Sequence, residues 1–377
     1  MKLGVDLSIM DELIDLNPHY FYEGKEIEVF SFFANHSRIS SVRIRVWVDP
    51  FDKDGMPYGG GSVDAVTALR LAKMARDNGM SVLVDFHYSD FWVDPSRQIC
   101  PKAWVGKTFP QVKRALYSYT KKVLTSFKKE NIDVIGVQVG NEITNGMTFP
   151  YGQIEKEYHP ETGGGFKGHA YLLKMGIKAV KEVYPNAKTI IHLEHSGSNG
   201  MQDWYYSKCI ELGVDFDVMG ESYYPYWHGP IVDFIDNITK LKNKFHKEIW
   251  VVEIGYEFAQ SHLLEDESLR GKEELDKEVI CDINEKVPSP FSKAGQAKYM
   301  ATMLETCKKL GIEMVYYWEP SWIYIEDNSW AKPAGERYCG YEPGAPVNSW
   351  ANSTLFDFNG NANPAIDVFS QDFVDKL

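Results

Sequence analysis

Short apolar stretches alternate with amphipathic helical patterns eight times along the 377 residues, and this alternation constrains the fold more than any other feature. Each helical crossover returns the chain to the same edge of a sheet, so the pattern favours parallel strands with helices packed outside them. Eight such units are the number that closes a parallel barrel. The predicted strands are residues 3–7, 42–50, 82–90, 132–142, 189–195, 216–224, 248–256 and 314–320.

The segments between these strands have apolar residues at helical spacing and ordinary start and stop signals. In residues 62–79, for example, Ser62 is the expected helix cap, and Asn78-Gly79 ends the helix. Four alanines and one leucine between them share one face. Because no linker or repeat divides the chain, we predict the α/β class, with a single (β/α)8 TIM barrel over residues 1–377. A charged insertion at about residues 257–293 interrupts the rhythm. A doubly wound open sheet is the alternative, but no glycine-rich dinucleotide turn follows the first strand.

Polar side chains gather at the predicted carboxyl ends of the strands, where barrels of this kind place their active sites. Asn141 and Glu142 end the fourth strand, and Glu253 ends the seventh. An isolated Asn-Glu pair is an ordinary turn sequence. Strands four and seven lie nearly opposite in a barrel, however, so the two carboxylates can face each other across its mouth. Facing carboxylates suit glycoside cleavage, and a separation of roughly 5–5.5 Å would retain the anomeric configuration.

Seven motifs occur in order along nearly the whole chain: VRIRVWVDP (42–50), VLVDFHYSDFWVDP (82–95), VQVGNE (137–142), SYYPYWHG (222–229), VVEIGY (251–256), YYWEPSW (316–322) and STLFDFNGNANPAIDVF (353–369). Together they resemble the endo-β-1,4-galactanases, family 53 of the glycoside hydrolases, in the barrel clan with glutamates on strands four and seven. The resemblance implies endo-cleavage of β-1,4-galactan from pectic side chains, with retention, on a polysaccharide or oligosaccharide substrate. The substrate rests on the resemblance alone, so a mannanase or glucanase of the same clan is the alternative.

The resemblance also implies roles for individual residues. Glu142 would be the acid/base and Glu253 the nucleophile, while Asn141 would hold the 2-hydroxyl of the sugar being cleaved. Arg45 would keep Glu253 ionised, because a nearby cation favours the charged form of a carboxyl; otherwise Arg45 is a surface arginine on an alternating strand. Acid/base work requires a raised pKa at Glu142, which burial and the opposing charge of Glu253 would supply.

Further positions are implied to contact the sugar. His87 lies in DFHYSD, the stretch that lines the glycone side in the family, although a buried histidine bonded to a neighbouring acceptor is the alternative. Trp318 ends strand eight, where the clan places a tryptophan under the sugar, and Trp92 would be a platform for an outer subsite. Either tryptophan is equally consistent with a core position. The remaining implied contacts are Asp85, Tyr224 and His228.

Composition limits the partners. The net charge of −13 disfavours nucleic acid and anionic membranes, and no apolar run reaches membrane-spanning length. The five dispersed cysteines form no CxxC pair and indicate free thiols. The opening MKLGVDLSIM lacks leader features, which on a literal interpretation indicates the cytoplasm. The alternative is secretion with a leader already removed, as in most relatives, and we expect a monomer in either case.

Metal chemistry is the remaining alternative. Several bacterial members of the family have a calcium site in the loop after strand seven, but residues 259–278 have acids spaced as on a solvated helix, so we expect no metal cofactor. Five dispersed histidine and glutamate residues, of the types that bind metals, suggest a metal-dependent barrel hydrolase instead. No HxH pair ends strand one, however, and strand alternation puts His192 and His195 on opposite faces. A non-catalytic sugar-binding barrel would not need both glutamates. The five residues that suggest metal binding are His87, His192, Glu194, His195 and His228.

Overall fold

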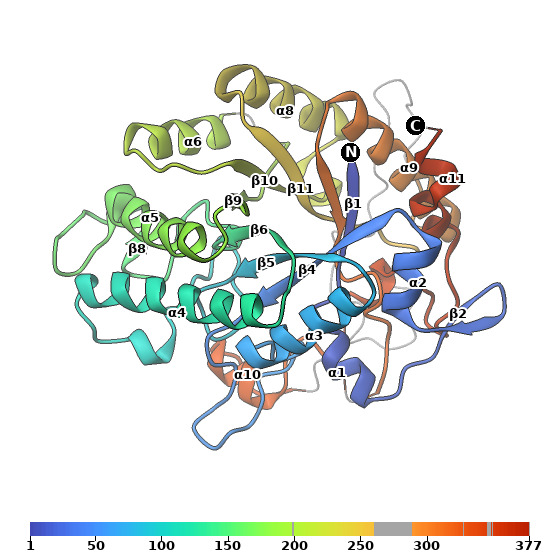
Figure 1. Ribbon diagram of the computed structural model, residues 1–377, viewed down its shortest axis with the longest axis horizontal. Coiled ribbons are helices and arrows are strands. Elements are labelled where there is room, and N and C mark those ends of the chain that lie inside the picture. Colours follow the sequence, from blue (N-terminus) through green and yellow to red (C-terminus); the bar gives the residue numbers. More distant parts are fainter. Residues whose placement is uncertain (198–199, 260–288, 327, 345–347, 349, 377) are drawn as a thin grey trace.

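The computed structural model describes residues 1–377 except 198–199, 260–288, 327, 345–347, 349 and 377. Within these residues, eight parallel strands form a closed barrel (Figure 1). Strand β1 pairs with both β4 and β12, which closes the barrel and excludes an open sheet. The predicted barrel is therefore confirmed. In hydrogen-bonded order the strands are β1 (Lys2–Asp6), β12 (Met314–Tyr317), β11 (Glu248–Ile254), β10 (Val218–Tyr223), β9 (Lys188–Leu193), β6 (Val134–Val139), β5 (Ser81–Phe86) and β4 (Ile39–Val46).

Helices cover the outside of the barrel (Figure 1). Two short antiparallel pairs, β2 (Tyr20–Tyr22) with β3 (Lys25–Ile27) and β7 (Gly146–Met147) with β8 (Gly152–Gln153), lie in the connecting loops. No described helix is long and apolar enough to cross a membrane. The helices are α1 (Met10–Asp15), α2 (Val29–His36), α3 (Ala65–Asp77), α4 (Phe109–Lys129), α5 (Gly165–Val183), α6 (Met201–Glu211), α7 (Pro225–His228), α8 (Ile231–Phe245), α9 (Lys293–Lys309), α10 (Pro333–Tyr338) and α11 (Gln371–Val374).

The N-cap of helix α3 is Asp64, two residues later than the predicted Ser62. The Asp64 carboxylate accepts hydrogen bonds from the N–H groups of Val66 and Thr67 at 3.0 and 2.8 Å. Ser62, the predicted cap, instead accepts a hydrogen bond from the N–H of Gly59 in the preceding turn. Both residue types cap helices well, but Asp64 directly precedes the first helical residue and adds a negative charge at the positive end of the helix. The prediction of Ser62 as the cap was wrong.

Large side chains fill the interior of the barrel where small residues make room for them. Trp250 projects inward among Leu83, Ile190 and Val252, all buried. A side chain at Gly4 would come within 2.4 Å of the ring of Tyr316, so only glycine fits at that point on β1. The interior is thus packed, and the functional space lies at the end of the barrel.

The strands end one to four residues earlier than the apolar patterns indicate. Strand β6 ends at Val139 and β9 at Leu193, so Glu142 and His195 lie on loops beyond the strand ends. The backbone of Glu142 has a φ of 47°, and that of Glu319, beyond β12, has a φ of 44°. These left-handed turns end the strand alternation, so residues past this point are no longer assigned to a face by odd or even spacing.

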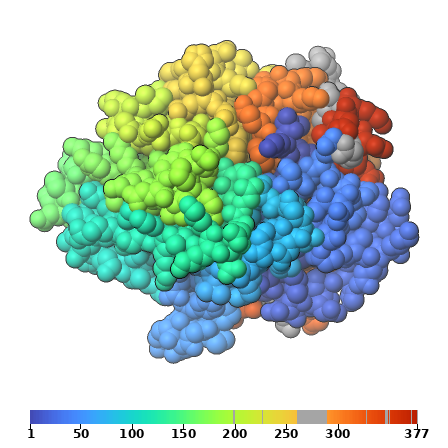
Figure 2. All heavy atoms as spheres, viewed as in Figure 1, coloured from blue at the N-terminus to red at the C-terminus, as the bar shows by residue number. Residues whose placement is uncertain are grey.

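Both chain ends lie at the opposite end of the barrel from these loops. Met1, Lys2, Val374 and Asp375 line one groove together with Ser81, the first residue of β5. Figure 1 shows the two ends near each other, and Figure 2 shows the loop that joins β4 to α3 projecting from the lower edge in light blue. Residues 260–288 of the predicted charged insertion are outside the described residues. The four described cysteines, Cys100, Cys209, Cys307 and Cys339, are free.

Candidate active site

A pocket of about 630 Å³ opens at the carboxyl ends of the strands. Its wall combines acidic groups with a large aromatic surface, which suits a ligand that has both hydroxyl groups and apolar ring faces. The lining residues are Arg43, Arg45, His87, Trp92, Val93, Asp94, Pro95, Arg97, Asn141, Glu142, Glu194, His195, Tyr224, Trp227, His228, Glu253, Trp318, Trp330, Tyr341 and Trp350.

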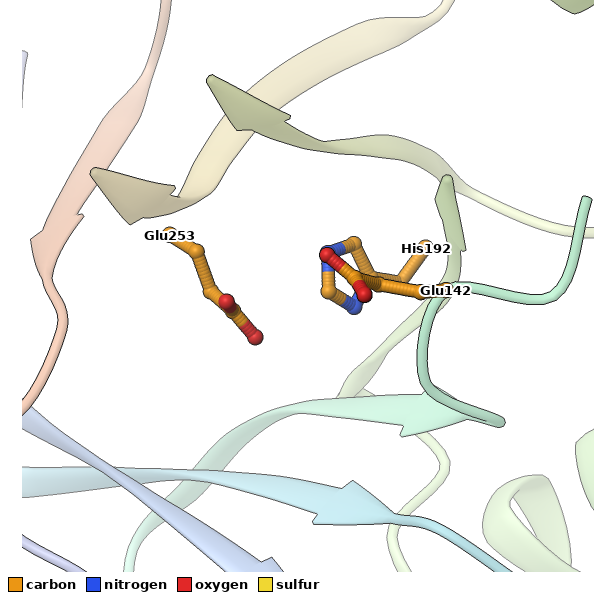
Figure 3. A group of neighbouring side chains, drawn as sticks. All are labelled: Glu142, His192 and Glu253. Atoms are coloured by element: carbon orange, nitrogen blue, oxygen red, sulfur yellow. The ribbon is translucent and has the colours of Figure 1, made fainter. Parts of the chain in front are cut away.

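The two glutamates face each other across this pocket. Figure 3 shows Glu253 extending from the end of β11 toward Glu142, whose carboxylate lies beside the ring of His192. One oxygen of Glu142, one oxygen of Glu253 and a ring nitrogen of His192 all lie within 4.8 Å of one another. So close an approach is compatible with the roughly 5–5.5 Å spacing of the carboxyl groups in retaining glycosidases.

Arg43, not Arg45, holds Glu253. The Arg43 guanidinium donates to Glu253 Oε1 at 2.7 Å, to Asp85 Oδ2 at 2.8 Å and to Asp6 Oδ2 at 2.6 Å. Burial alone would lower the pKa of Arg43, but Asp85, Glu253 and Asp6 raise it, so the group is a permanent cation. The predicted pairing of Arg45 with Glu253 was therefore wrong.

Arg45 lies two residues further along β4 and bonds groups on two loops, one after β12 and one between β4 and α3. Its guanidinium bonds the carboxylate of Glu319 and the carbonyl of Gly60, and it stacks 4.3 Å from the ring of Trp92. Both arginines are about 99% buried and point inward, because residues two apart share a face of a strand. The two-residue spacing places Arg43 and Arg45 both inside the barrel. Which of them reaches Glu253 depends on the height of each residue along the barrel axis.

The turn after β6 presents Asn141 and Glu142 to the same pocket. Gly140 has a φ of 102°, a conformation that favours glycine, and Glu142 follows in a left-handed conformation. The Asn141 amide oxygen accepts from Arg43 at 3.1 Å and its nitrogen donates to the carbonyl of Val93 at 3.2 Å. The second amide hydrogen of Asn141 is not used by these contacts, and Asn141 lines the pocket.

A chain of hydrogen bonds under the pocket fixes the protonation of His192. Gln138 Oε1 accepts from Arg43 Nε at 2.7 Å, so its Nε2 group faces Asp85 Oδ1 at 3.0 Å and His192 Nδ1 at 2.8 Å. His192 Nδ1 must then accept, and Nε2 donates to the Ser222 hydroxyl at 2.7 Å. Burial lowers the pKa of His192 well below its usual value, which agrees with a neutral ring. The Ser222 hydroxyl is then free to donate to Glu142, which favours the ionised form of that carboxyl.

The carboxyl pair is electrostatically asymmetric. Burial, followed by the charges of Glu253 and Glu194, raises the pKa of Glu142 well above its ordinary value. Burial also raises the pKa of Glu253, to about 7, but Arg43 opposes that rise. The pair therefore holds its proton on Glu142 and its negative charge on Glu253. The predicted rise in the pKa of Glu142 is confirmed.

Asp85 and His87 support the site from below. Asp85 is fully buried and bonded to Arg43, Gln138 and His87 Nε2, at 3.0 Å for the last, so it does not reach the pocket wall. Trp47 donates to His87 Nδ1 at 3.1 Å. Both ring nitrogens of His87 are thus engaged, as in the alternative of a satisfied buried histidine, although part of the ring lines the pocket. Neither residue is placed to offer a polar atom to the sugar directly.

The predicted aromatic residues do line the pocket. Trp318 packs edge-on against Trp350 with ring centroids 5.1 Å apart, and Trp92 stacks on Trp322 at 6.1 Å. Tyr224 donates to Glu253 Oε2 at 3.4 Å, and His228 Nδ1 accepts from the N–H of Tyr224 at 3.1 Å. Trp92, Trp318, Tyr224 and His228 therefore all line the pocket, and their contact with a sugar stays a prediction.

Sequence reasoning missed several positioning residues. Arg43 shows the same signal as Arg45, and Gln138 is the polar member of the apolar stretch VIGVQV, where a buried amide must find partners. Ser222 gave no signal above that of an ordinary small residue. Strand alternation does not place His195, because β9 has already ended at Leu193. His195 lies on the following loop and lines the pocket.

The family model described as Glycosyl hydrolase family 53 matches residues 2–369. The chain belongs to glycosyl hydrolase family 53. Among curated relatives, the family 53 chain is 32% identical to the endo-β-1,4-galactanase of Bacillus subtilis, over 93% of this chain and 80% of that protein. It is 30% identical to the arabinogalactan endo-β-1,4-galactanase of Cellvibrio japonicus, over 98% of this chain and 91% of that protein.

Solved structures agree with this family assignment. The family 53 catalytic domain of Ignisphaera aggregans superposes with a TM-score of 0.84 at 32% identity, covering 98% of this chain and 95% of that one. Membership of the family makes the chain a glycosidase. The two-glutamate retaining mechanism is general for the barrel clan to which this family belongs.

Proposed function

We propose that this family 53 enzyme is an endo-β-1,4-galactanase that cleaves β-1,4-galactan with retention of anomeric configuration. The observation that carries the proposal is the facing pair of Glu142 and Glu253, whose carboxylate oxygens come within 4.8 Å in a pocket walled by aromatic rings. The galactanase names of the curated relatives support the choice of substrate.

The first step of the reaction needs a charged nucleophile and a protonated acid. A carboxylate oxygen of Glu253 attacks the anomeric carbon and forms an ester bond to it. The glycosidic C–O bond breaks, and the Glu142 proton moves to the oxygen of the leaving sugar. Arg43 keeps Glu253 ionised and aimed, and Asn141 offers its remaining amide hydrogen to a hydroxyl of the reacting sugar.

The second step reverses the proton movement. Glu142, now ionised, takes a proton from a water molecule, whose oxygen attacks the anomeric carbon on the face that the leaving sugar vacated. The ester bond to Glu253 breaks, and its carboxylate returns to Arg43. Two displacements on opposite faces give net retention.

We further propose that this chemistry uses no metal. His192 is the nitrogen ligand nearest the two glutamates, but its Nδ1 accepts from Gln138 and its Nε2 donates to Ser222, so it has no lone pair left for a cation. Arg43 already supplies a fixed cation that bonds Glu253, Asp85 and Asp6. Galactan hydrolysis unchanged by excess chelator would support this proposal, and loss of activity restored by a divalent cation would overturn it.

The substrate proposal is tested by incubating the enzyme separately with β-1,4-galactan, mannan and cellulose, and following products by chain length. Rapid appearance of mid-length galacto-oligosaccharides is expected, and NMR of the first products should show the β-anomer. Activity only on mannan or cellulose would overturn the galactan proposal. An initial α-anomer would overturn retention.

A further inference from the structure

Glu194 is a second buried carboxyl beside the acid/base, and the two-step reaction does not use it. It follows the end of β9, lines the pocket and is only 3% exposed. Among the described residues, no donor meets either of its carboxylate oxygens with good hydrogen-bond geometry, although the hydroxyl and N–H groups of Thr144 lie close enough to lower its pKa. His195 Nε2 lies 3.7 Å from Glu194 Oε1, too far for a hydrogen bond, and burial raises the pKa of Glu194 to about 7.

A carboxyl in this state is costly to keep. Burying a polar group without a partner costs free energy, and buried polar side chains are nearly always satisfied. Other buried acids of this barrel follow that rule: Glu221, on neighbouring β10, accepts from Ser196 and Tyr206 at 2.9 and 3.2 Å. Because Glu194 faces the pocket, a bound ligand can supply the hydrogen-bond donors that the protein does not.

The position of Glu194 indicates which part of the substrate it meets. Strand β9 is hydrogen-bonded to β6, the strand that leads to Glu142, and it is separated from β11 and Glu253 by β10. The charge of Glu194 is one of the main influences on Glu142, whereas the acids that act most on Glu253 are Asp85 and Asp6. The oxygen that Glu142 protonates belongs to the leaving sugar, so the Glu142 side of the pocket is the side of that sugar.

We propose that Glu194 binds the leaving sugar by accepting hydrogen bonds from its hydroxyl groups, and so helps to select a carbohydrate leaving group. The inference rests on the proposed galactanase function. Two carboxylate oxygens can accept from two hydroxyls of one sugar ring, and these donors favour the ionised form of Glu194, whose hydrogen bonds are the stronger kind. A leaving group without hydroxyls would gain nothing from Glu194.

The test compares two substrates in E194A and wild type. One substrate is β-1,4-galactan, whose leaving group is a sugar; the other is 4-nitrophenyl β-1,4-galactobioside, whose leaving group is nitrophenol. We expect kcat/KM on galactan to fall about tenfold to a hundredfold in E194A, the cost of a lost hydrogen bond to a charged group. On the aryl substrate we expect a change of no more than about threefold by the same reasoning.

E194Q separates contact from charge, since glutamine keeps one acceptor but removes the negative charge. We expect E194Q to lie closer to wild type than E194A on galactan. If E194A and E194Q lose kcat/KM on galactan equally, and the basic limb of the pH profile is displaced equally in both, the role of Glu194 is purely electrostatic. That result would overturn the proposal. Equal losses on both substrates, or no loss on either, would overturn it as well.

Two controls complete the design. E221Q replaces a buried acid that does not line the pocket, so it should lower the melting temperature while leaving the ratio of the two activities unchanged. A melting curve for E194A shows whether the variant is folded. Wild type inactive on galactan would overturn the proposed function and this inference with it, whereas an active wild type with an unchanged E194A would overturn the inference alone.

Discussion

The two sides of the pocket differ in how completely their polar groups are paired. Around Glu253, Arg43 joins Asp6, Asp85, Asn141 and the nucleophile in one buried network. Around Glu142, the protein offers the Ser222 hydroxyl, and no donor among the described residues meets neighbouring Glu194 with good hydrogen-bond geometry. The nucleophile is thus held before substrate arrives, while the acid/base side leaves hydrogen-bonding capacity for the substrate and for a moving proton.

The comparison is tested most strongly by removing the nucleophile. Glu253→Ala should lower kcat on galactan by about 10⁴-fold or more, because no other group is held in line with the anomeric carbon. Added azide should restore turnover and give an α-glycosyl azide, since the small anion attacks from the vacated face. The measurement is initial rate with NMR of the product; unchanged turnover would contradict the assignment of Glu253.

Removing the acid/base should cost less, and the cost should depend on the leaving group. Glu142→Ala is expected to lower kcat/KM on galactan by about 10²–10⁴-fold, the usual contribution of general acid–base catalysis. With 4-nitrophenyl β-1,4-galactobioside, whose leaving group needs little protonation, the first step should be much less affected. Equal losses on both substrates would show that Glu142 does not act as the acid.

The two buried arginines offer a matched pair. Arg43→Met and Arg45→Met should each lower the free energy of unfolding by about 3–5 kcal/mol, since each leaves a buried carboxylate unpaired. Only Arg43→Met should move the acid limb of the kcat/KM profile to higher pH, because loss of the cation raises the pKa of Glu253. Denaturant titration and pH profiles measure the two effects, and an acid limb displaced by Arg45→Met instead would reverse their roles.

The smallest expected effect is a pH-dependent gain in stability. The pKa of Glu142 is raised in the folded protein, so its destabilising effect is absent below the unfolded pKa of about 4.3 and grows as pH rises toward the folded value. Glu142→Gln should therefore match wild type near pH 4 and melt about 1–2 °C higher near pH 8, the shift that roughly 1 kcal/mol gives in a chain of 377 residues. A difference that shrinks with rising pH would contradict the raised pKa.

The fold was accessible from sequence because local patterns determine it. Eight apolar stretches with helices between them leave few architectures other than a closed barrel, and the ends of strands four and seven then fall opposite each other. Glu142 and Glu253 were predictable for this reason. The pocket positions of Trp92 and Trp318 required the resemblance as well, since buried tryptophans are common in any core.

The remaining details depend on register and on turn geometry. Arg43 and Arg45 are equivalent in an alternating pattern, and only the stagger of neighbouring strands places the side chain of Arg43 at the level of Glu253. The pocket-facing position of Glu194 follows from the turn after β9, which no local pattern encodes. Similarly, Asp85 and His87 carry the residue types of a binding motif, yet their bonds to Arg43 and Trp47 turn them into supports.

The groove shared by both chain ends has a practical consequence. Met1 and Asp375 line the same groove at the end of the barrel opposite the pocket that contains Glu142 and Glu253. Tethering the enzyme to a solid support through either end would therefore leave the mouth of the barrel facing solution, where a long polysaccharide can approach it. Joining those ends and cutting a surface loop elsewhere is equally compatible with this geometry.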